Sequence, residues 1–272
     1  MRNANEKPGM TAVHDDAQPI SHFSFLISHY LNKYGFGQFC PKAVLFDMDG
    51  VLYDSMPNHA IAWQQSMKKF GIHMTEADAY ATEGARGVDT IRQMVKEQQG
   101  RDIDEAEAQM MYDEKTLQFH ALPKPPVMPG IPELMKQIKA DGLTIGVVTG
   151  SGQRPLIKRL LDDFGAYLNP SHIITAYDVT HGKPAPDPYL AGLKKAGNLQ
   201  PWEAIIVENA PLGVRAGVAA RVFTIAVNTG PLPDKVLTQE GANLIFDQMT
   251  DLASAWSDIY SSSSSSSSKS ES

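Results

Sequence analysis

Two aspartates with one residue between them directly follow a short apolar run. Asp47 and Asp49 come after Ala43–Phe46 and precede Gly50. Two carboxylates at the end of a buried strand repel each other unless a cation lies between them. Such a pair could hold Mg²⁺, with one carboxylate serving as a nucleophile and the other as a general acid and base. The alternative is an ordinary turn at the end of a strand.

Thr149, Gly150 and Ser151 follow a second apolar run, Thr144–Val148. A hydroxyl and backbone N–H groups next to glycine, just before a helix, suit the binding of a phosphate group. The alternative is a plain strand-to-helix turn.

Charged and amide side chains follow two later apolar runs. Lys183 lies in a segment bounded by proline, where its ammonium could neutralise phosphate oxygens, although a lone lysine is often only solvated. Glu208 and Asn209 follow Ala204–Val207 and offer oxygen ligands to a metal. The four groups together predict one site that binds a metal and a phosphate.

The elements that must position these residues alternate between short apolar strands and helices of amphipathic spacing. This order is typical of a doubly wound α/β fold with a parallel sheet, a Rossmann-like core. Carboxyl ends of parallel strands lie along one edge of the sheet, where ligands bind. The predicted strands are Ala43–Phe46, Thr144–Val148, His172–Thr175, Ala204–Val207 and Val222–Val227, and two of the predicted core helices are Pro132–Ala140 and Pro155–Phe164.

A long insertion between the first two strands has helical but no strand spacing. We expect its helices over His59–Phe70, Asp89–Gln99 and Glu105–His120, with a hinge near Pro123–Pro129. We therefore expect residues 56–127 to form a helical cap domain over the site, and residues 41–55 with 128–258 to form the core.

Both ends of the chain differ in composition from the middle. We expect residues 1–40 to be a partly disordered extension. Within it, we expect Ile20–Phe39 to be a short docking helix or part of an over-long upstream start rather than a signal peptide. The serine run leads us to expect a disordered tail over residues 259–272.

Composition excludes several classes of function. A net charge of −7 argues against a nucleic-acid partner, whose phosphates would need clustered Lys and Arg, and no apolar run is long enough to span a membrane. The single cysteine, Cys40, fits a reducing compartment, so we expect a cytoplasmic protein, and a monomer whose partner is a small phosphorylated substrate.

The four strand-end groups in this order resemble the four motifs of the haloacid dehalogenase superfamily, over about residues 42–246. The run from Asp47 to Ser55, with His59 and Trp63, resembles its β-phosphoglucomutase-like subfamily. The resemblance implies Asp47 as nucleophile, Asp49 as acid and base, and Thr149 and Lys183 as phosphate ligands. It also implies Mg²⁺ held by Asp47, the Asp49 carbonyl and an acid of the fourth motif.

The sequence departs from that family pattern at the fourth motif, where Glu208 is followed by Asn209 instead of aspartate. An amide oxygen can bind Mg²⁺ but removes one negative charge from the site. We expect Glu83, in a cap loop bounded by glycines, to complete the metal shell when the cap closes. This combination resembles a branch of the subfamily that includes an inorganic pyrophosphatase.

Further cap residues bear on the substrate. The cap loop of the mutases resembles Lys-Gly-x-x-Arg, with the arginine binding a second phosphate, and Arg86 here is one residue out of place. We keep Arg86, His59 and Lys115 as candidate substrate-binding residues, together with Gly150 and Ser151.

Three functions follow from these residues. The first is a Mg²⁺-dependent phosphohydrolase that prefers pyrophosphate to sugar phosphates. The second is a β-phosphoglucomutase. The third, from another class, is a catalytically weak protein that binds metal or phosphate.

Overall fold

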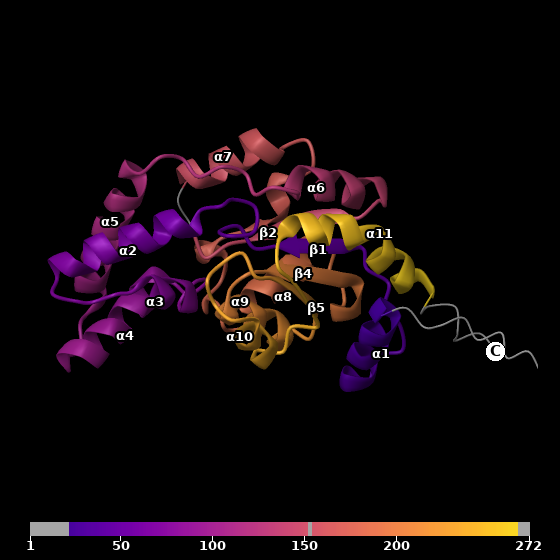
Figure 1. Cartoon of the computed structure of the whole chain (residues 1–272), viewed down its shortest axis with the longest axis horizontal. Coiled ribbons are helices and arrows are strands. Elements are labelled where there is room, and N and C mark those ends of the chain that lie inside the picture. The colour runs from indigo at the N-terminus through magenta and orange to yellow at the C-terminus, as the bar shows by residue number, and fades with distance from the viewer. Residues whose placement is uncertain (1–21, 152–153, 266–272) are drawn as a thin grey trace, which may run out of the picture.

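The structure is a computed structural model that describes residues 22–151 and 154–265. Within these ranges the strands form one parallel sheet of six strands, in the order β3-β2-β1-β4-β5-β6 (Figure 1). The strands are β1 (Ala43–Phe46), β2 (Thr144–Val148), β3 (Ile173–Ile174), β4 (Ala204–Glu208), β5 (Phe223–Val227) and β6 (Leu244–Phe246). The predicted doubly wound α/β core is confirmed.

Helices cover both faces of this sheet and also form the insertion between β1 and β2. The core helices are α1 (His22–Tyr34), α6 (Ile131–Ala140), α7 (Arg154–Phe164), α8 (Asp187–Lys195), α9 (Pro211–Ala219), α10 (Asp234–Gln239) and α11 (Met249–Ser265). The insertion holds α2 (Met56–Lys69), α3 (Glu76–Ala81), α4 (Gly87–Gln99) and α5 (Glu105–Ala121).

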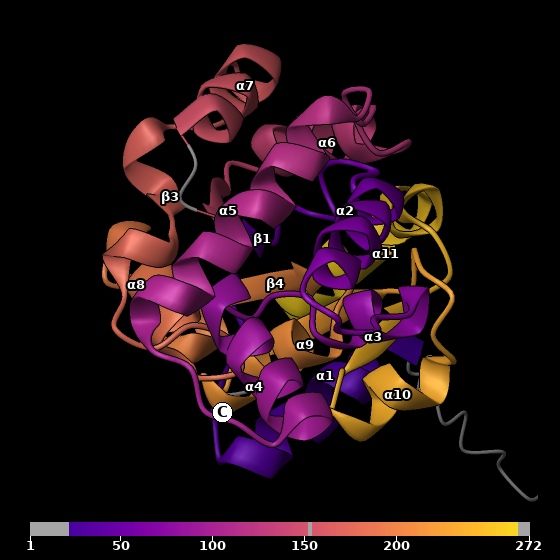
Figure 2. The ribbon, with the colours of Figure 1, turned by 90° about the vertical axis from the view of Figure 1, so that its left-hand side faces the viewer.

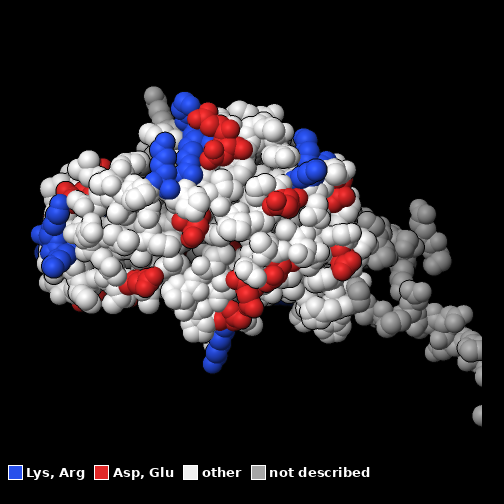
Figure 3. Space-filling view, turned by 45° about the horizontal axis from the view of Figure 1, so that its top comes forward, with Lys and Arg blue, Asp and Glu red and all other residues white. Residues whose placement is uncertain are grey.

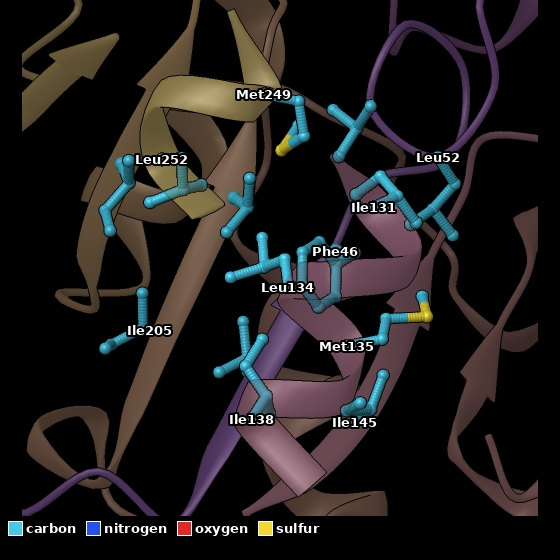
Figure 4. Close-up of a cluster of buried hydrophobic side chains, with 14 of the residues drawn as sticks. Phe46, Leu52, Ile131, Leu134, Met135, Ile138, Ile145, Ile205, Met249 and Leu252 are labelled. Atoms are coloured by element: carbon cyan, nitrogen blue, oxygen red, sulfur yellow. The ribbon is translucent and has the colours of Figure 1, made fainter. Parts of the chain in front are cut away.

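Alternation along β1 sends its side chains to two separate hydrophobic layers. Val44 and Phe46 pack with residues of α1, α6, α7 and α11 on one face, as the close-up of the α6 and α11 side shows (Figure 4). Ala43 and Leu45 pack with residues of α8 and α9 on the other. Because both faces are buried, every residue of β1 is apolar, and the strand end is held rigidly.

The insertion has a hydrophobic core of its own, built from Met56, Trp63, Met67, Ile91 and other buried side chains of α2 to α5. Figure 2, seen from the side of the insertion, shows these helices in front of β1 and β4. The inserted helical cap is therefore confirmed. We did not predict α3, which is only six residues long and begins with a capping box at Thr75.

Two chain segments join the cap to the core and pair with each other. Tyr53 and Val127 form an antiparallel bridge. The amide of Asp54 donates to the carbonyl of Pro126 at 3.0 Å, and the amide of Met128 donates to the carbonyl of Leu52 at 2.9 Å. The predicted hinge region is thus one half of a short two-stranded link.

The two ends of the chain are more ordered than expected where the structure describes them. Helix α1 lies where a docking helix was expected, and Ile27 and Tyr30 are buried in the core. Helix α11 continues to Ser265, which differs from the tail that we expected from residue 259, because buried Ile259 packs in the core and Ser263 donates to a helix carbonyl. Residues 1–21 and 266–272 lie outside the described ranges.

Surface charge agrees with the composition. On the face drawn in Figure 3, Lys and Arg side chains alternate with Asp and Glu and do not gather into one basic patch. In the described part of the chain, every helix is too short or too polar to cross a bilayer.

Candidate active site

The register of the sheet brings the predicted strand-end residues side by side. Phe46 is level with Val147 of β2 and with Val207 of β4. Asp47, Thr149 and Glu208 therefore lie at neighbouring strand ends. The chain leaves β1 toward β2 and β3 on one side and returns to β4 on the other, so this is the switch point at which α/β sheets bind ligands.

Lys183 ties three of these strand ends together. Its buried ammonium donates to Asp47 Oδ1 at 2.5 Å, to Glu208 Oε1 at 2.6 Å and to the carbonyl of Val148 at 3.1 Å. Burial lowers the pKa of Lys183, but the two carboxylates outweigh it and hold the pKa above its ordinary value. Lys183 is therefore a fixed positive charge beside Asp47.

Glu208 is fully engaged by protein groups. Its Oε1 also accepts from the Tyr189 hydroxyl at 2.5 Å, and its Oε2 accepts from the amides of Asn209 and Ala210 at 3.1 and 3.4 Å. The carboxylate lies so close to Gly213 that a Cβ there would be 1.9 Å from Oε1. Glu208 thus orients Lys183. Because both oxygens of Glu208 already have protein partners, Asn209 is the better placed of the two predicted metal ligands.

Asn209 carries an unusual buried oxygen. Among the described residues, its Oδ1 is the buried side-chain polar atom without a hydrogen-bond partner. Such an atom costs free energy unless something binds it. The amide is held in place by Gly50, where an added Cβ would lie 2.0 Å from Asn209 Nδ2.

These oxygens fit Mg²⁺ better than a transition metal. No cluster of three or more His, Cys, Asp and Glu side chains in the described ranges is arranged around a metal position. Mg²⁺ instead takes one or two carboxylates, other oxygens and several waters. Asp47, the carbonyl of Asp49 and Oδ1 of Asn209 would hold it.

Asp49 is connected to the cap through a chain of hydrogen bonds. Its Oδ1 accepts from the Ser55 hydroxyl at 2.6 Å and lies 3.2 Å from His59 Nε2. His59 Nδ1 lies 2.7 Å from the Lys115 ammonium, which can only donate, so the imidazole proton lies on Nε2. Burial raises the pKa of Asp49, but His59, Ser55 and Lys115 outweigh it and hold the pKa below its usual value.

Glu83 brings a fourth carboxylate to the site, from the cap. Burial, followed by the charges of Asp49 and Asp47, raises the pKa of Glu83 to about 8. Burial likewise raises the pKa of Asp47 to about 7, with Glu208 and Asp49 adding to it and Lys183 opposing it. A divalent cation among these carboxylates would relieve the repulsion, which agrees with the free oxygen of Asn209.

The cap loop lies in direct contact with the core. A Cβ on Gly150 would be 3.2 Å from the carbonyl oxygen of Gly84, and a Cβ on Gly84 would be 3.2 Å from Lys183 Cδ. Thr149 Oγ1 accepts from the amide of Ser151 at 3.0 Å, which shapes the loop that was predicted to bind phosphate. The structure thus shows the cap closed over the strand ends.

A cavity of about 40 Å³ remains between the cap and the core. Its walls include Asp49, His59, Glu83, Lys115, Gly150 and Ser151. The buried ammonium of Lys115 has aromatic neighbours, with Trp63 and Phe119 at 5.1 and 5.2 Å from ring centre to Nζ. Burial lowers the pKa of Lys115 to about 8, against the opposite effect of Glu83 and Asp49.

Arg86 does not join this cavity. Its guanidinium pairs with Asp89 at 2.7 and 3.1 Å, and its Cγ lies over Gly182. The sequence placed Arg86 among the substrate-binding candidates because it stands in the right loop. The direction of a side chain in an irregular loop could not be read from that position.

Two residues of the site escaped the analysis of the sequence. Ser55, which binds Asp49, is the N-cap position of α2, and Tyr189, which binds Glu208, lies in the first turn of α8. A serine before a helix and a tyrosine on an apolar helix face usually have structural roles. Their spacing from Asp49 and Lys183, six residues in each case, was the available signal.

Comparison with known proteins gives consistent relatives. Hexitol phosphatase A of Escherichia coli K12 is 32% identical over 187 residues, which are 69% of this chain and 83% of that protein. Beta-phosphoglucomutase of Bacillus subtilis is 26% identical over 219 residues, covering 78% of this chain and 91% of that one.

A solved structure gives a closer match in fold and sequence. It is of a protein from Bacteroides vulgatus that is provisionally described as a beta-phosphoglucomutase. It shares 48% identity and a TM-score of 0.85, and the match covers 88% of this chain and 97% of that one. Residues 44–227, which span most of the core and the whole cap, match the model of one protein family. The chain therefore belongs to the haloacid dehalogenase-like hydrolases.

Proposed function

We propose that this enzyme is a Mg²⁺-dependent phosphohydrolase that works through a phosphoaspartate. A carboxylate oxygen of Asp47 forms a bond to phosphorus as the bond from phosphorus to the leaving oxygen breaks. Asp49, which has to take up a proton when the substrate binds because its pKa is low in the free site, gives that proton to the leaving oxygen. Asp49 then takes a proton from a water that attacks the phosphoaspartate, which releases phosphate and restores Asp47. Because Oδ1 of Asp49 accepts from Ser55 and His59, the transferred proton travels on Oδ2.

The other residues bind and stabilise the transferring group. Lys183 is a fixed cation next to Asp47. Thr149 and Gly150 follow β2, the neighbour of β1, and we expect the hydroxyl of Thr149 and the amide of Gly150 to bind the phosphoryl oxygens. Bound Mg²⁺ would supply charge neutralisation between Asp47 and the phosphoryl oxygens. The closed cap excludes water from this position until the leaving group departs.

We propose inorganic pyrophosphate as the favoured substrate. The observation that carries this is the position of Glu83, which faces Asp47 and Asp49 in a cavity of about 40 Å³. A sugar beyond the phosphate would have to push the cap loop outward. A second phosphate is more compact than a sugar, and we expect it to lie beside Lys115 in the wall of the cavity.

β-Phosphoglucomutase activity is the second candidate. It is favoured by the B. subtilis enzyme and by the protein from B. vulgatus, whose descriptions both name that activity. Against it stands Arg86, which would have to bind the second phosphate of a sugar bisphosphate but pairs with Asp89 outside the cavity. The E. coli relative adds hexitol phosphates to the substrates that need testing.

A substrate panel tests the proposal. Phosphate release would be measured with pyrophosphate, a hexitol 6-phosphate and β-glucose 1-phosphate, each with Mg²⁺ and with excess chelator. We expect the highest kcat/KM with pyrophosphate, and no turnover without the metal. Conversion of β-glucose 1-phosphate to glucose 6-phosphate in the presence of a bisphosphate activator, faster than pyrophosphate hydrolysis, would establish the mutase instead. Turnover in excess chelator would overturn the role of Mg²⁺.

A further inference from the structure

Two glycines of the core, neither with a side chain that could take part in the reaction, lie directly beneath cap residues. We call Gly182 and Gly230 the cap-contact glycines. A Cβ on Gly230 would lie 2.6 Å from Cδ1 and Cε1 of Tyr80, and a Cβ on Gly182 would lie 2.9 Å from Cγ of Arg86. Contacts this short do not occur between real side chains, so the cap can come this close only where the core has no side chain.

Backbone conformation does not explain these glycines. Neither Gly182 nor Gly230 is among the glycines with a positive φ, so alanine could adopt the same backbone at both positions. Open space does not explain them either, since each faces a packed side chain. What remains is the contact with the cap.

The Gly230 contact is linked to the catalytic turn. The neighbouring Thr229 hydroxyl donates to the carbonyl of Gly50 at 2.7 Å, and Leu232 of the same loop packs against the cap core. Tyr80 is itself only 7% exposed and belongs to that cap core. The loop 228–233 therefore touches the turn that carries Asp49 on one side and the cap on the other.

We propose that Gly182 and Gly230 are specificity-determining residues, because they set how far the cap closes and so how small the cavity beside Glu83 becomes. Full closure brings the carbonyl of Gly84 against Gly150 and Glu83 toward the two aspartates. An added methyl group at either glycine holds the cap partly open. A small substrate then loses its contact with Glu83, whereas a bulky phosphate ester gains room.

The inference rests on the proposed function for its choice of small substrate, but its test does not depend on pyrophosphate alone. The variants are Gly230→Ala and Gly182→Ala. The matched control is Gly37→Ala, since Gly37 also lacks a positive φ and an added Cβ there meets nothing within 4 Å. All four proteins, wild type included, would first be compared by thermal melting to show that the core is folded.

The first measurement is the ratio of kcat/KM for pyrophosphate to that for a hexitol 6-phosphate. We expect both cap-contact variants to lower this ratio by roughly tenfold, the usual effect of forcing one methyl group into a packed contact. Gly37→Ala should keep the wild-type ratio. A ratio in both variants equal to that of Gly37→Ala would overturn the inference.

The second measurement follows closure without turnover. Hydrogen exchange of the amides in the cap loop, residues 82–86, would be recorded with Mg²⁺ and with and without inorganic phosphate. We expect phosphate to slow exchange in the wild type and in Gly37→Ala but less in Gly230→Ala and Gly182→Ala. If wild type does not hydrolyse pyrophosphate, the proposed function fails, and this exchange experiment still decides the inference.

A compensating change separates contact with the cap from general damage. Valine has no δ carbon, so Tyr80→Val removes the atoms that an alanine at position 230 would meet. The double variant Gly230→Ala with Tyr80→Val should recover the protection of the cap loop relative to Gly230→Ala alone. Additive losses in the double variant would count against a direct contact as the cause.

Discussion

The strand-end half of the site and the cap half are held in different ways. On the core side, Asp47 and Glu208 follow buried strands whose register fixes their separation, and Lys183 joins them through hydrogen bonds of 2.5 and 2.6 Å. On the cap side, Glu83 and Lys115 stand on a unit with its own hydrophobic core. In the function that we propose, the core side carries out the chemistry and the cap side selects the substrate.

Loss of the nucleophile should have the largest effect. Asp47→Asn keeps the shape and the hydrogen bond to Lys183 but removes the attacking charge, so we expect turnover of every substrate to fall by at least roughly 10⁴-fold. Phosphate release and thermal melting would be measured on the same preparation. A well-folded variant that releases phosphate at the wild-type rate would rule out the covalent route, and with it the proposal that the core side carries out the chemistry.

Removal of the cap carboxylate should lower the turnover of some substrates more than others instead of abolishing turnover of all of them. Glu83→Ala takes away a carboxyl group that faces Asp47 and Asp49 from the cap. We expect pyrophosphate turnover to fall by about 10²-fold while sugar phosphates lose much less, as judged by kcat/KM for each. Glu83→Gln is the matched control for size. Equal losses on all substrates would assign Glu83 to the chemistry and not to selection.

The metal should respond to Asn209 more moderately. Asn209→Ala removes one proposed oxygen ligand, so the Mg²⁺ concentration for half-maximal rate should rise roughly 10–100-fold. Asn209→Asp should lower it, although the added charge lies near Asp47 and could slow the reaction by repulsion. Magnesium titrations that stay unchanged in both variants would place Asn209 outside the ligand set.

The smallest expected effect comes from pH. The pKa of Asp47 is raised to about 7, chiefly by burial, and a protonated carboxyl binds Mg²⁺ poorly. Lowering the pH through this value should therefore weaken Mg²⁺ binding, by roughly tenfold for one unit below the pKa. Calorimetric titration with Mg²⁺ across this range would show proton release on binding. Affinity independent of pH would mean that Asp47 is already ionised.

The difference between the two halves also explains what the sequence could predict. We predicted Asp47 and Thr149 as neighbours because the ends of parallel strands must align, and the structure places them after the adjacent strands β1 and β2. The face that Arg86 presents depends on an irregular loop, and spacing did not reveal it. Short elements such as β6 and α3 have too few residues for a period to be recognised.

Tertiary packing also overrode local composition at the end of the chain. A serine run has little tendency to order by itself, yet α11 extends through it to Ser265. The reason lies earlier in the helix, where Trp256 and Ile259 are each 1% exposed and pack in the core. These buried side chains anchor the helix from which the serine run continues. A local reading of composition could not include those contacts.

The paired link between cap and core restricts motion to one axis. A single connecting chain would let the cap twist as well as swing, whereas two antiparallel crossings joined between residues 52–54 and 126–128 resist torsion. We therefore expect the cap to swing about this link, so that each closure returns Gly84 to its contact with Gly150. Substitutions in the cap could then change which substrate is bound without changing how the cap is aligned with the core.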